Sequence, residues 1–273
     1  MPGRRGRNLR QGDLAEGLGL EWIRPFAAVA RVPREEDIGF DAVCTLLRRE
    51  GSLLMAEDSF LVQVKASSVR TIAYQDDDYR WLQQLRPPLF IASVDLSRSE
   101  VEVYTTQRGV DPVDASWSGV CMYLDSDEVG DGEDYDHGPD VRDGVHHVHL
   151  GPPVLRWTPS DMNDELARCT ASEVMKAWIR WEERNYYLRG FGGCFVPKWR
   201  TGEPPRRQYY RFGQLDEEAV ADAQLKLAYV LFATAPHCTS EERSSLLQAL
   251  EVLRTRGVYG TELDLARQTL ESS

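Results

Sequence analysis

Asp41, Gln63 and Lys65 are the residues of this chain whose types and spacing best suit chemistry. Asp41 belongs to the apolar run Gly39–Leu47, and Gln63 and Lys65 follow in the run Phe60–Lys65, 63 − 41 = 22 residues further on. Because side chains alternate along a β-strand, Gln63 and Lys65 are expected on one face, about 6.5 Å apart, with the apolar side chains on the other. A carboxylate on the neighbouring strand would then meet an amide and an ammonium at one point, an arrangement that suits a divalent cation and a phosphodiester.

A helix and a set of strands must position these residues. The pattern predicts a helix over 13–24, in which Leu14, Leu18, Glu21 and Trp22 fall at helical spacing. This spacing predicts that Glu21 lies in the apolar stripe that faces the core. Further elements are expected as strands at 27–32, around Asp41 and at 60–65, a helix from Asp76 to the residues before Pro87, and strands at 89–94 and 101–105. The predicted order is helix, three strands, helix, two strands.

The pattern becomes helical beyond Pro153. Residues 160–189 indicate one long helix or a broken pair, and residues 217–234 indicate another. Thr239-Ser240-Glu241-Glu242 has the form of a capping box ahead of a leucine-rich helix. The simplest partition is an α/β domain over residues 10–157, with an acidic flexible loop near 125–143, followed by a helical domain over residues 158–273.

The order helix, hairpin and strand that carries Glu21, Asp41 and Gln63-Val64-Lys65 resembles the PD-(D/E)XK nuclease superfamily, in the branch whose third motif is QxK. The flanking runs Asp37–Asp41 and Phe60–Ser67 also resemble a group of bacterial domains of unknown function assigned to that superfamily. The likeness covers roughly residues 10–106. It implies an α/β fold, an α+β mixed sheet with a restriction-endonuclease-like αβββαβ core, in front of the all-helical C-terminal region.

The resemblance also implies a role for each matching residue. Asp41 would hold Mg²⁺ or Mn²⁺, with Gln63 as a neutral ligand beside the carbonyl of Val64. Lys65 would activate water or stabilise charge, and Glu21 would be the carboxylate that many members carry on a helix. This chemistry is sound in itself, because Mg²⁺ prefers oxygen ligands and an ammonium offsets charge in a phosphoryl transition state. Gln63 departs from the usual acid at its position, so the cation loses one formal charge of attraction.

Composition restricts the class of protein. The formal net charge of the 273 residues is −12, of which −8 falls in the window 125–143, so a broadly basic nucleic-acid binder is excluded. No apolar run is long enough for a membrane span, and no signal peptide is evident at the start, which leads us to expect a cytoplasmic protein. The five cysteines lack the spacing of a zinc ribbon or a disulfide framework.

Two other groups of residues have alternative interpretations. Lys198, Arg200, Arg206 and Arg207 are interleaved with aromatic residues, which is typical of a nucleic-acid grip or of a basic packed loop. Four histidines indicate either a transition-metal site or an ordinary polar strand or loop, namely His137, His146, His147 and His149.

Two functional hypotheses follow. The first is a metal-dependent endonuclease that hydrolyses phosphodiester bonds in DNA, in preference to RNA, in bacterial restriction or antiviral defence. The helical half would then be a substrate clamp, a homo-oligomer surface or a docking site for a partner protein. The second is a catalytically decayed nuclease fold that acts as a protein or nucleic-acid interaction module.

Overall fold

The computed structural model describes residues 7–33, 39–110, 118–124, 140–142, 144–189, 193–212, 230, 238–255 and 261–272. The chain forms two compact units. The first comprises Met1–Tyr187 with Gly193–Phe212, and the second comprises Leu188–Gly192 with Gly213–Ser273. Each unit is described by itself. The described part contains no helix that combines the length and the apolar character needed to cross a membrane.

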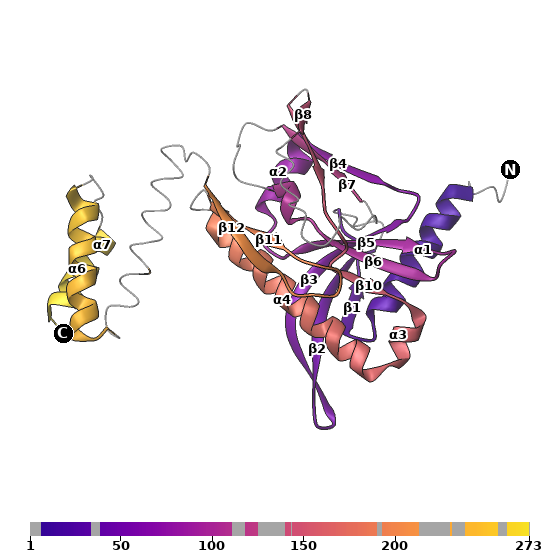
Figure 1. The fold of residues 1–273 in the computed structure, drawn as a ribbon, viewed down its shortest axis with the longest axis horizontal. Coiled ribbons are helices and arrows are strands. Elements are labelled where there is room, and N and C mark those ends of the chain that lie inside the picture. Colours follow the sequence, from indigo (N-terminus) through magenta and orange to yellow (C-terminus); the bar gives the residue numbers. More distant parts are fainter. Residues whose placement is uncertain are drawn as a thin grey trace. The chain divides into compact units, whose positions relative to one another are not determined.

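The first unit is built on a six-stranded mixed sheet (Figure 1). Its strands, in spatial order, are β1 (Ala27–Arg31), β2 (Ala42–Glu50), β3 (Leu53–Ala66), β5 (Leu89–Asp95), β6 (Glu100–Thr105) and β10 (Leu155–Trp157). β3 and β5 are parallel, and every other neighbouring pair is antiparallel. The chain follows the predicted order from α1 (Arg7–Ile23) through three strands to α2 (Asp76–Gln84) and two more strands. One short strand, β4 (Thr71–Gln75), is additional. The mixed α/β class is therefore confirmed.

Each face of this sheet carries its own apolar core. Phe60, Val62 and Val64 of β3 belong to one core, which α1 and α4 (Glu165–Arg189) complete. Leu61 belongs to the other core, on the opposite face. That second face is covered by α2 and by a four-stranded sheet of β4, β7 (Gly119–Tyr123), β9 (Val145–His149) and β8 (Asp140–Arg142), with a short 3₁₀ turn at Gln107–Val110. The alternation predicted for β3 is confirmed.

The face that α1 turns to the core differs in part from the prediction, because Trp22 is buried as expected but the other predicted residues are not. Leu14 and Leu18 are 50% and 39% exposed, whereas Leu20 is fully buried. The reason is Gly19, at which an added Cβ would lie 2.8 Å from Val94 Cγ2. The helix approaches the sheet through this small residue, and the resulting rotation of the helix turns Leu14 and Leu18 toward solvent.

α4 packs with the α/β unit, so the boundary predicted between residues 157 and 158 lies inside the first unit. Val174, Trp178 and Ile179 are buried in the core that α1 shares. The helical stretch is a broken pair, because α3 (Pro159–Asn163) ends at Asp164, whose Oδ1 accepts the Leu166 N–H at 2.8 Å. A hairpin of β11 (Gly193–Lys198) and β12 (Arg206–Phe212) follows α4.

β2 and β3 form a long arm that extends beyond the rest of the sheet (Figure 1). β3 continues without a break through Glu57 and Asp58. Ion pairs with α4 hold the strand there: Glu57 meets Lys176 at 2.8 Å, and Asp58 meets Arg180 at 3.0 Å. The tip of the arm is apolar and exposed at Leu53, Leu54 and Met55.

The second unit contains α6 (Ser240–Thr255) and α7 (Thr261–Ser272). The predicted capping box is confirmed, because Glu242 Oε2 accepts the Thr239 N–H at 2.8 Å and Thr239 Oγ1 accepts the Glu242 N–H at 3.4 Å. Leu250, Ala266 and Leu270 form the buried contact between the two helices. Apart from residue 230, the helix predicted over 217–234 lies outside the described residues, as does most of the acidic segment 125–143.

Candidate functional site

Asp41 lies immediately before β2 and bonds to β3 through both its backbone and its side chain. Its N–H donates to Val62 O at 2.8 Å, and its Oδ2 accepts the Val64 N–H at 2.6 Å. The N–H and C=O of one residue in an antiparallel pair point to the same neighbouring strand. The backbone N–H and C=O groups of Val62 and Val64 therefore point toward β2. The Val64 carbonyl thus lies on the side of the strand where Asp41 lies.

Gln63 is the β3 residue between Val62 and Val64, the two residues to which Asp41 bonds. The paired register of β2 and β3 begins at Ala42 and Val62, so Asp41 precedes it. Tyr74, from β4 of the covering sheet, donates its hydroxyl to Gln63 Oε1 at 3.0 Å. Gln63 and Tyr74 thus meet from two different sheets, beside the Val64 N–H that the Asp41 carboxylate accepts.

The Tyr74 hydroxyl stays protonated in this environment. Burial, followed by the negative charges of Asp41 and Asp78, raises the pKa of Tyr74 to about 12, against a smaller lowering by the bond to Gln63. Because the phenol keeps its proton over the physiological range, it remains a donor to the amide oxygen. Its sensitivity to Asp41 also indicates that hydroxyl and carboxylate are near one another.

Lys65 supplies a cation on the same face as Gln63. It lies two residues further along β3 and pairs across the sheet with Ser93 of β5, which in turn pairs with Glu102 of β6. Within the described residues, the Lys65 side chain has no hydrogen bond or ion pair. Its ammonium is half-buried and available to an anionic ligand.

Trp81 of α2 packs against two parts of this site, Tyr74 and the segment before Asp41. Its ring stacks with Tyr74, with centroids 6.3 Å apart. It also lies against Gly39, two residues before Asp41, where an added Cβ would be 2.9 Å from Trp81 Cη2. Gly39 has φ +98°, a conformation that residues with a Cβ rarely adopt. The tight contact and the positive φ together require glycine at this position.

Glu21 does not join the site, and the prediction that it faces the core is wrong. Its side chain is 51% exposed and pairs with Arg24 at 3.1 Å and Arg31 at 3.3 Å. α1 packs on the sheet face that carries Val64, whereas Gln63 and Lys65 point to the opposite face. The unpredicted rotation of α1 about Gly19 explains the difference.

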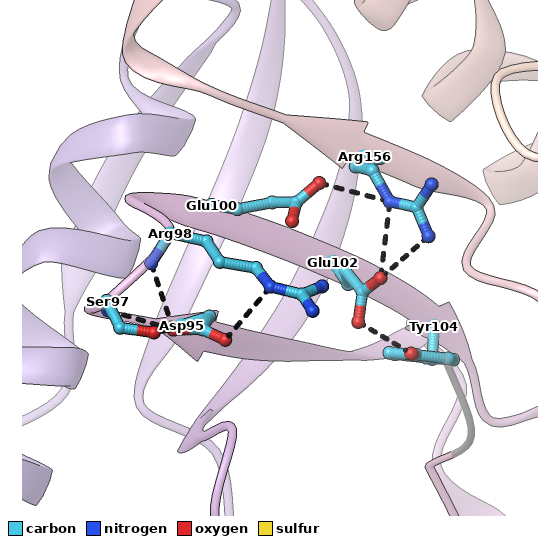
Figure 2. Close-up of polar contacts among 7 residues, drawn as sticks. All are labelled: Asp95, Ser97, Arg98, Glu100, Glu102, Tyr104 and Arg156. Atoms are coloured by element: carbon cyan, nitrogen blue, oxygen red, sulfur yellow. Dashed lines mark hydrogen bonds and ion pairs between the residues drawn. The ribbon is translucent and has the colours of Figure 1, made fainter. Parts of the chain in front are cut away.

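A second polar group lies further along the same sheet face, on β5, β6 and β10 (Figure 2). Arg156 bridges Glu100 Oε1 at 3.1 Å and Glu102 Oε1 at 2.9 Å, and Tyr104 donates to Glu102 Oε2 at 2.9 Å. Asp95 accepts hydrogen bonds from the turn that follows it. Each of these acids already has a partner within the protein, so the group ties β10 to the sheet.

The basic residues predicted to grip nucleic acid lie on the β11–β12 hairpin and just beyond β11. Lys198, Arg200, Arg206 and Arg207 are all exposed. Arg206 pairs with Glu203 at 3.1 Å, and the Arg207 guanidinium lies 5.3 Å from the ring centroid of Phe195. The hairpin therefore presents the expected combination of cations and an aromatic ring.

The histidine cluster separates over two faces of β9. His146 is buried, whereas His147 and His149 point to the outer face, where both rings stack with Tyr123 at 5.9 and 5.0 Å. His147 Nδ1 and the Tyr123 hydroxyl share a hydrogen bond of 2.9 Å. In the described part of the chain, no three or more His, Cys, Asp or Glu side chains gather to hold a metal. His137 lies outside that part.

The Asp41 site fits a hard divalent cation by its donor chemistry. Asp41 contributes a carboxylate, Gln63 a carboxamide oxygen and Val64 a main-chain carbonyl, and all three are oxygen donors. Mg²⁺ retains several waters and needs few protein ligands, so this small set is sufficient. The residues present therefore fit Mg²⁺ or Mn²⁺.

Comparison with protein-family models, with curated proteins and with solved structures found no match for this chain. The interpretation of the site therefore depends on its own geometry.

The sequence patterns missed three residues that shape the site: Gly39, Tyr74 and Trp81. Ile72 and Tyr74 are buried on one face of β4 between exposed neighbours, which is a weak strand signal in a segment of only five residues. Gly39 precedes a strand, where a glycine commonly marks a turn. Only the packing of α2 against β4 connects these residues to Asp41 and Gln63.

Proposed function

We propose that this protein is a divalent-metal-dependent nuclease that hydrolyses phosphodiester bonds in DNA. The observation that carries the proposal is the Asp41 carboxylate, which accepts the N–H of Val64, the β3 residue between Gln63 and Lys65. Asp41, Gln63 and the Val64 carbonyl would hold Mg²⁺ or Mn²⁺. The bound cation would polarise the phosphate and acidify a water.

The protein's own side chains have distinct tasks in this proposal. Lys65 stabilises the negative charge that develops on the phosphate oxygens, or takes part in orienting the attacking water. Asp41 is held in place by the Val64 N–H. Lys198, Arg200 and Arg207 on and beside the β11–β12 hairpin contact the phosphate backbone. DNA in preference to RNA, and a setting in bacterial restriction or antiviral defence, follow from the resemblance to PD-(D/E)XK nucleases.

The test is nicking of supercoiled plasmid by the purified chain with Mg²⁺ or Mn²⁺. Lys65→Ala is expected to lower the rate by about 10²–10³-fold, the loss typical of removing one group that stabilises transition-state charge. Asp41→Asn is expected to abolish nicking, as is EDTA. Asp77→Asn is the matched control, because the Asp77 side chain is exposed and pairs with Arg80 at 3.0 Å.

A second function, a nuclease fold retained as an interaction module, is favoured by one observation. Glu21 is occupied by Arg24 and Arg31, and Gln63 is neutral, so Asp41 is the single carboxylate of the Asp41, Gln63, Val64 set. The exposed apolar tip of the β2–β3 arm would then contact a protein partner. Equal nicking by wild type, Asp41→Asn and Lys65→Ala, or none by any of them, would support this function instead.

A further inference from the structure

Gln63 has a side chain with two different ends, and only one of them suits a cation. Its carboxamide carries an oxygen that accepts hydrogen bonds and an NH₂ group that donates them. A neighbouring carboxylate attracts the NH₂ end, because charge-assisted hydrogen bonds are strong. Asp41 lies just before β2, and its carboxylate accepts the N–H of Val64, the residue next to Gln63. These two side chains alone would therefore turn the NH₂ of Gln63 toward Asp41 and its oxygen away.

Tyr74 supplies a donor that opposes this arrangement. Its hydroxyl donates to Gln63 Oε1 at 3.0 Å, and its ring is 6% exposed and stacked on Trp81. The Asp41 carboxylate accepts the N–H of Val64, the residue that follows Gln63, and its negative charge acts on the Tyr74 hydroxyl. A donor fixed at this place attracts the amide oxygen. It therefore holds the oxygen of Gln63 at the hydroxyl on which the charge of Asp41 acts.

We propose that Tyr74 is a positioning residue, whose O–H holds the Gln63 carboxamide with its oxygen presented beside Asp41, ready to bind a divalent cation. The proposal rests on the proposed function, since it assigns a role in the same site. An amide oxygen has two lone pairs, so acceptance from Tyr74 leaves one for the cation. A carboxylate at position 63 would have two equivalent oxygens and would not need this restraint.

The equivalence of carboxylate oxygens provides the test. Mn²⁺ binding to the full chain is measured by calorimetry for wild type, Tyr74→Phe, Gln63→Glu and the double variant. Tyr74→Phe is expected to weaken Mn²⁺ binding by about 10-fold, at the lower end of the effect of partners that orient metal ligands. The same substitution in the Gln63→Glu background is expected to leave the affinity nearly unchanged.

Two outcomes overturn the proposal alone. Equal weakening in both backgrounds would mean that Tyr74 supports the site only by packing, and no weakening in either would mean that it does not position Gln63. By contrast, if wild-type protein binds no Mn²⁺, or binds it equally well after Asp41→Ala, the proposed function fails.

A measurement without metal tests the positioning role of Tyr74 even if the proposed function fails. The side-chain NH₂ signals of Gln63 in ¹⁵N-labelled protein are assigned from their absence in Gln63→Glu. Tyr74→Phe keeps the ring in the core, and circular dichroism checks that the fold is retained. The Gln63 NH₂ protons are then expected to gain the Asp41 acceptor and to move downfield. Unchanged signals would overturn the positioning role.

Discussion

At the scale of single residues, the addition of one methyl group would be enough to disturb the site. Gly39 is the clearest case, because its positive φ and its contact with Trp81 both exclude a side chain. It stands two residues before Asp41, so any backbone shift that relieves the contact displaces the carboxylate. The backbone conformation at Gly39 therefore determines the position of the Asp41 carboxylate.

Gly39→Ala is therefore expected to damage both stability and the site. The left-handed conformation alone makes the folded state less stable by about 1–3 kcal/mol. Chemical denaturation measures this loss, and Mn²⁺ titration measures the displacement of Asp41. Gly51→Ala is a matched control, since Gly51 also has positive φ, at +62°, but an added Cβ there meets nothing within 4 Å. Equal loss of Mn²⁺ affinity in both variants would contradict the role given to the Trp81 contact.

The part of the site that lies on β3 was predictable at this scale. Alternation placed Gln63 and Lys65 on one face because the period of a strand is a local property. Glu21 was not predictable, because the rotation of a helix depends on what it packs against, here Gly19 on Val94. Tyr74 was not predictable either, since its contact with Gln63 depends on a second sheet assembled from distant segments.

At the scale of elements, α4 is fastened to the sheet by charge as well as by apolar packing. Glu57 of β3 accepts from Lys176 of α4 and from Arg48 of β2, at 2.8 and 2.9 Å. The hydrogen bond from Lys176, more than any other contact, lowers the pKa of Glu57 from its ordinary 4.5. A carboxyl whose pKa is lower in the folded state stabilises the fold above its unfolded pKa, and this contribution is lost as the pH falls through the folded value.

Glu57→Gln is accordingly expected to lower the free energy of unfolding at neutral pH and to have progressively less effect as the pH falls below 4.5. Urea denaturation at a series of pH values measures the difference. Glu50→Gln serves as the comparison, because Glu50 also meets Arg48, at 3.4 Å, but its side chain is 62% exposed. A destabilisation by Glu57→Gln that does not vary with pH would show that the effect comes from packing rather than from the charge.

At the scale of the whole molecule, the chain contains two units with separate cores. The described residues of the two large cores all fall between Ala15 and Trp199, and the third core lies between Leu246 and Leu270. The sequence predicted a helical C-terminal region from residue 158, and the first compact unit extends through most of α4 and includes the β11–β12 hairpin. The apolar face of α4 does not reveal by its periodicity alone that its partner is the sheet.

A chain ending at Phe212 is therefore expected to fold and to keep the Asp41 site. Its thermal midpoint should lie within about 3 °C of that of the first unit in the full chain, the shift that 1 kcal/mol produces in a protein of this size. Calorimetry compares the two transitions, and Mn²⁺ titration compares the sites. Failure of the shortened chain to unfold cooperatively would contradict the independence of the two units.

The indole of Trp81 has an evolutionary consequence. The Trp81 ring packs against Gly39, just before Asp41, and against Tyr74, which bonds to Gln63. A change in the size of this ring would therefore disturb both proposed metal ligands at once. Among homologues, positions 39, 74 and 81 are therefore expected to be inherited as a set, even where the surrounding strands diverge. Homologues that have replaced one of these three residues are expected to have replaced the other two as well. In such homologues the residue at position 41 is expected to vary.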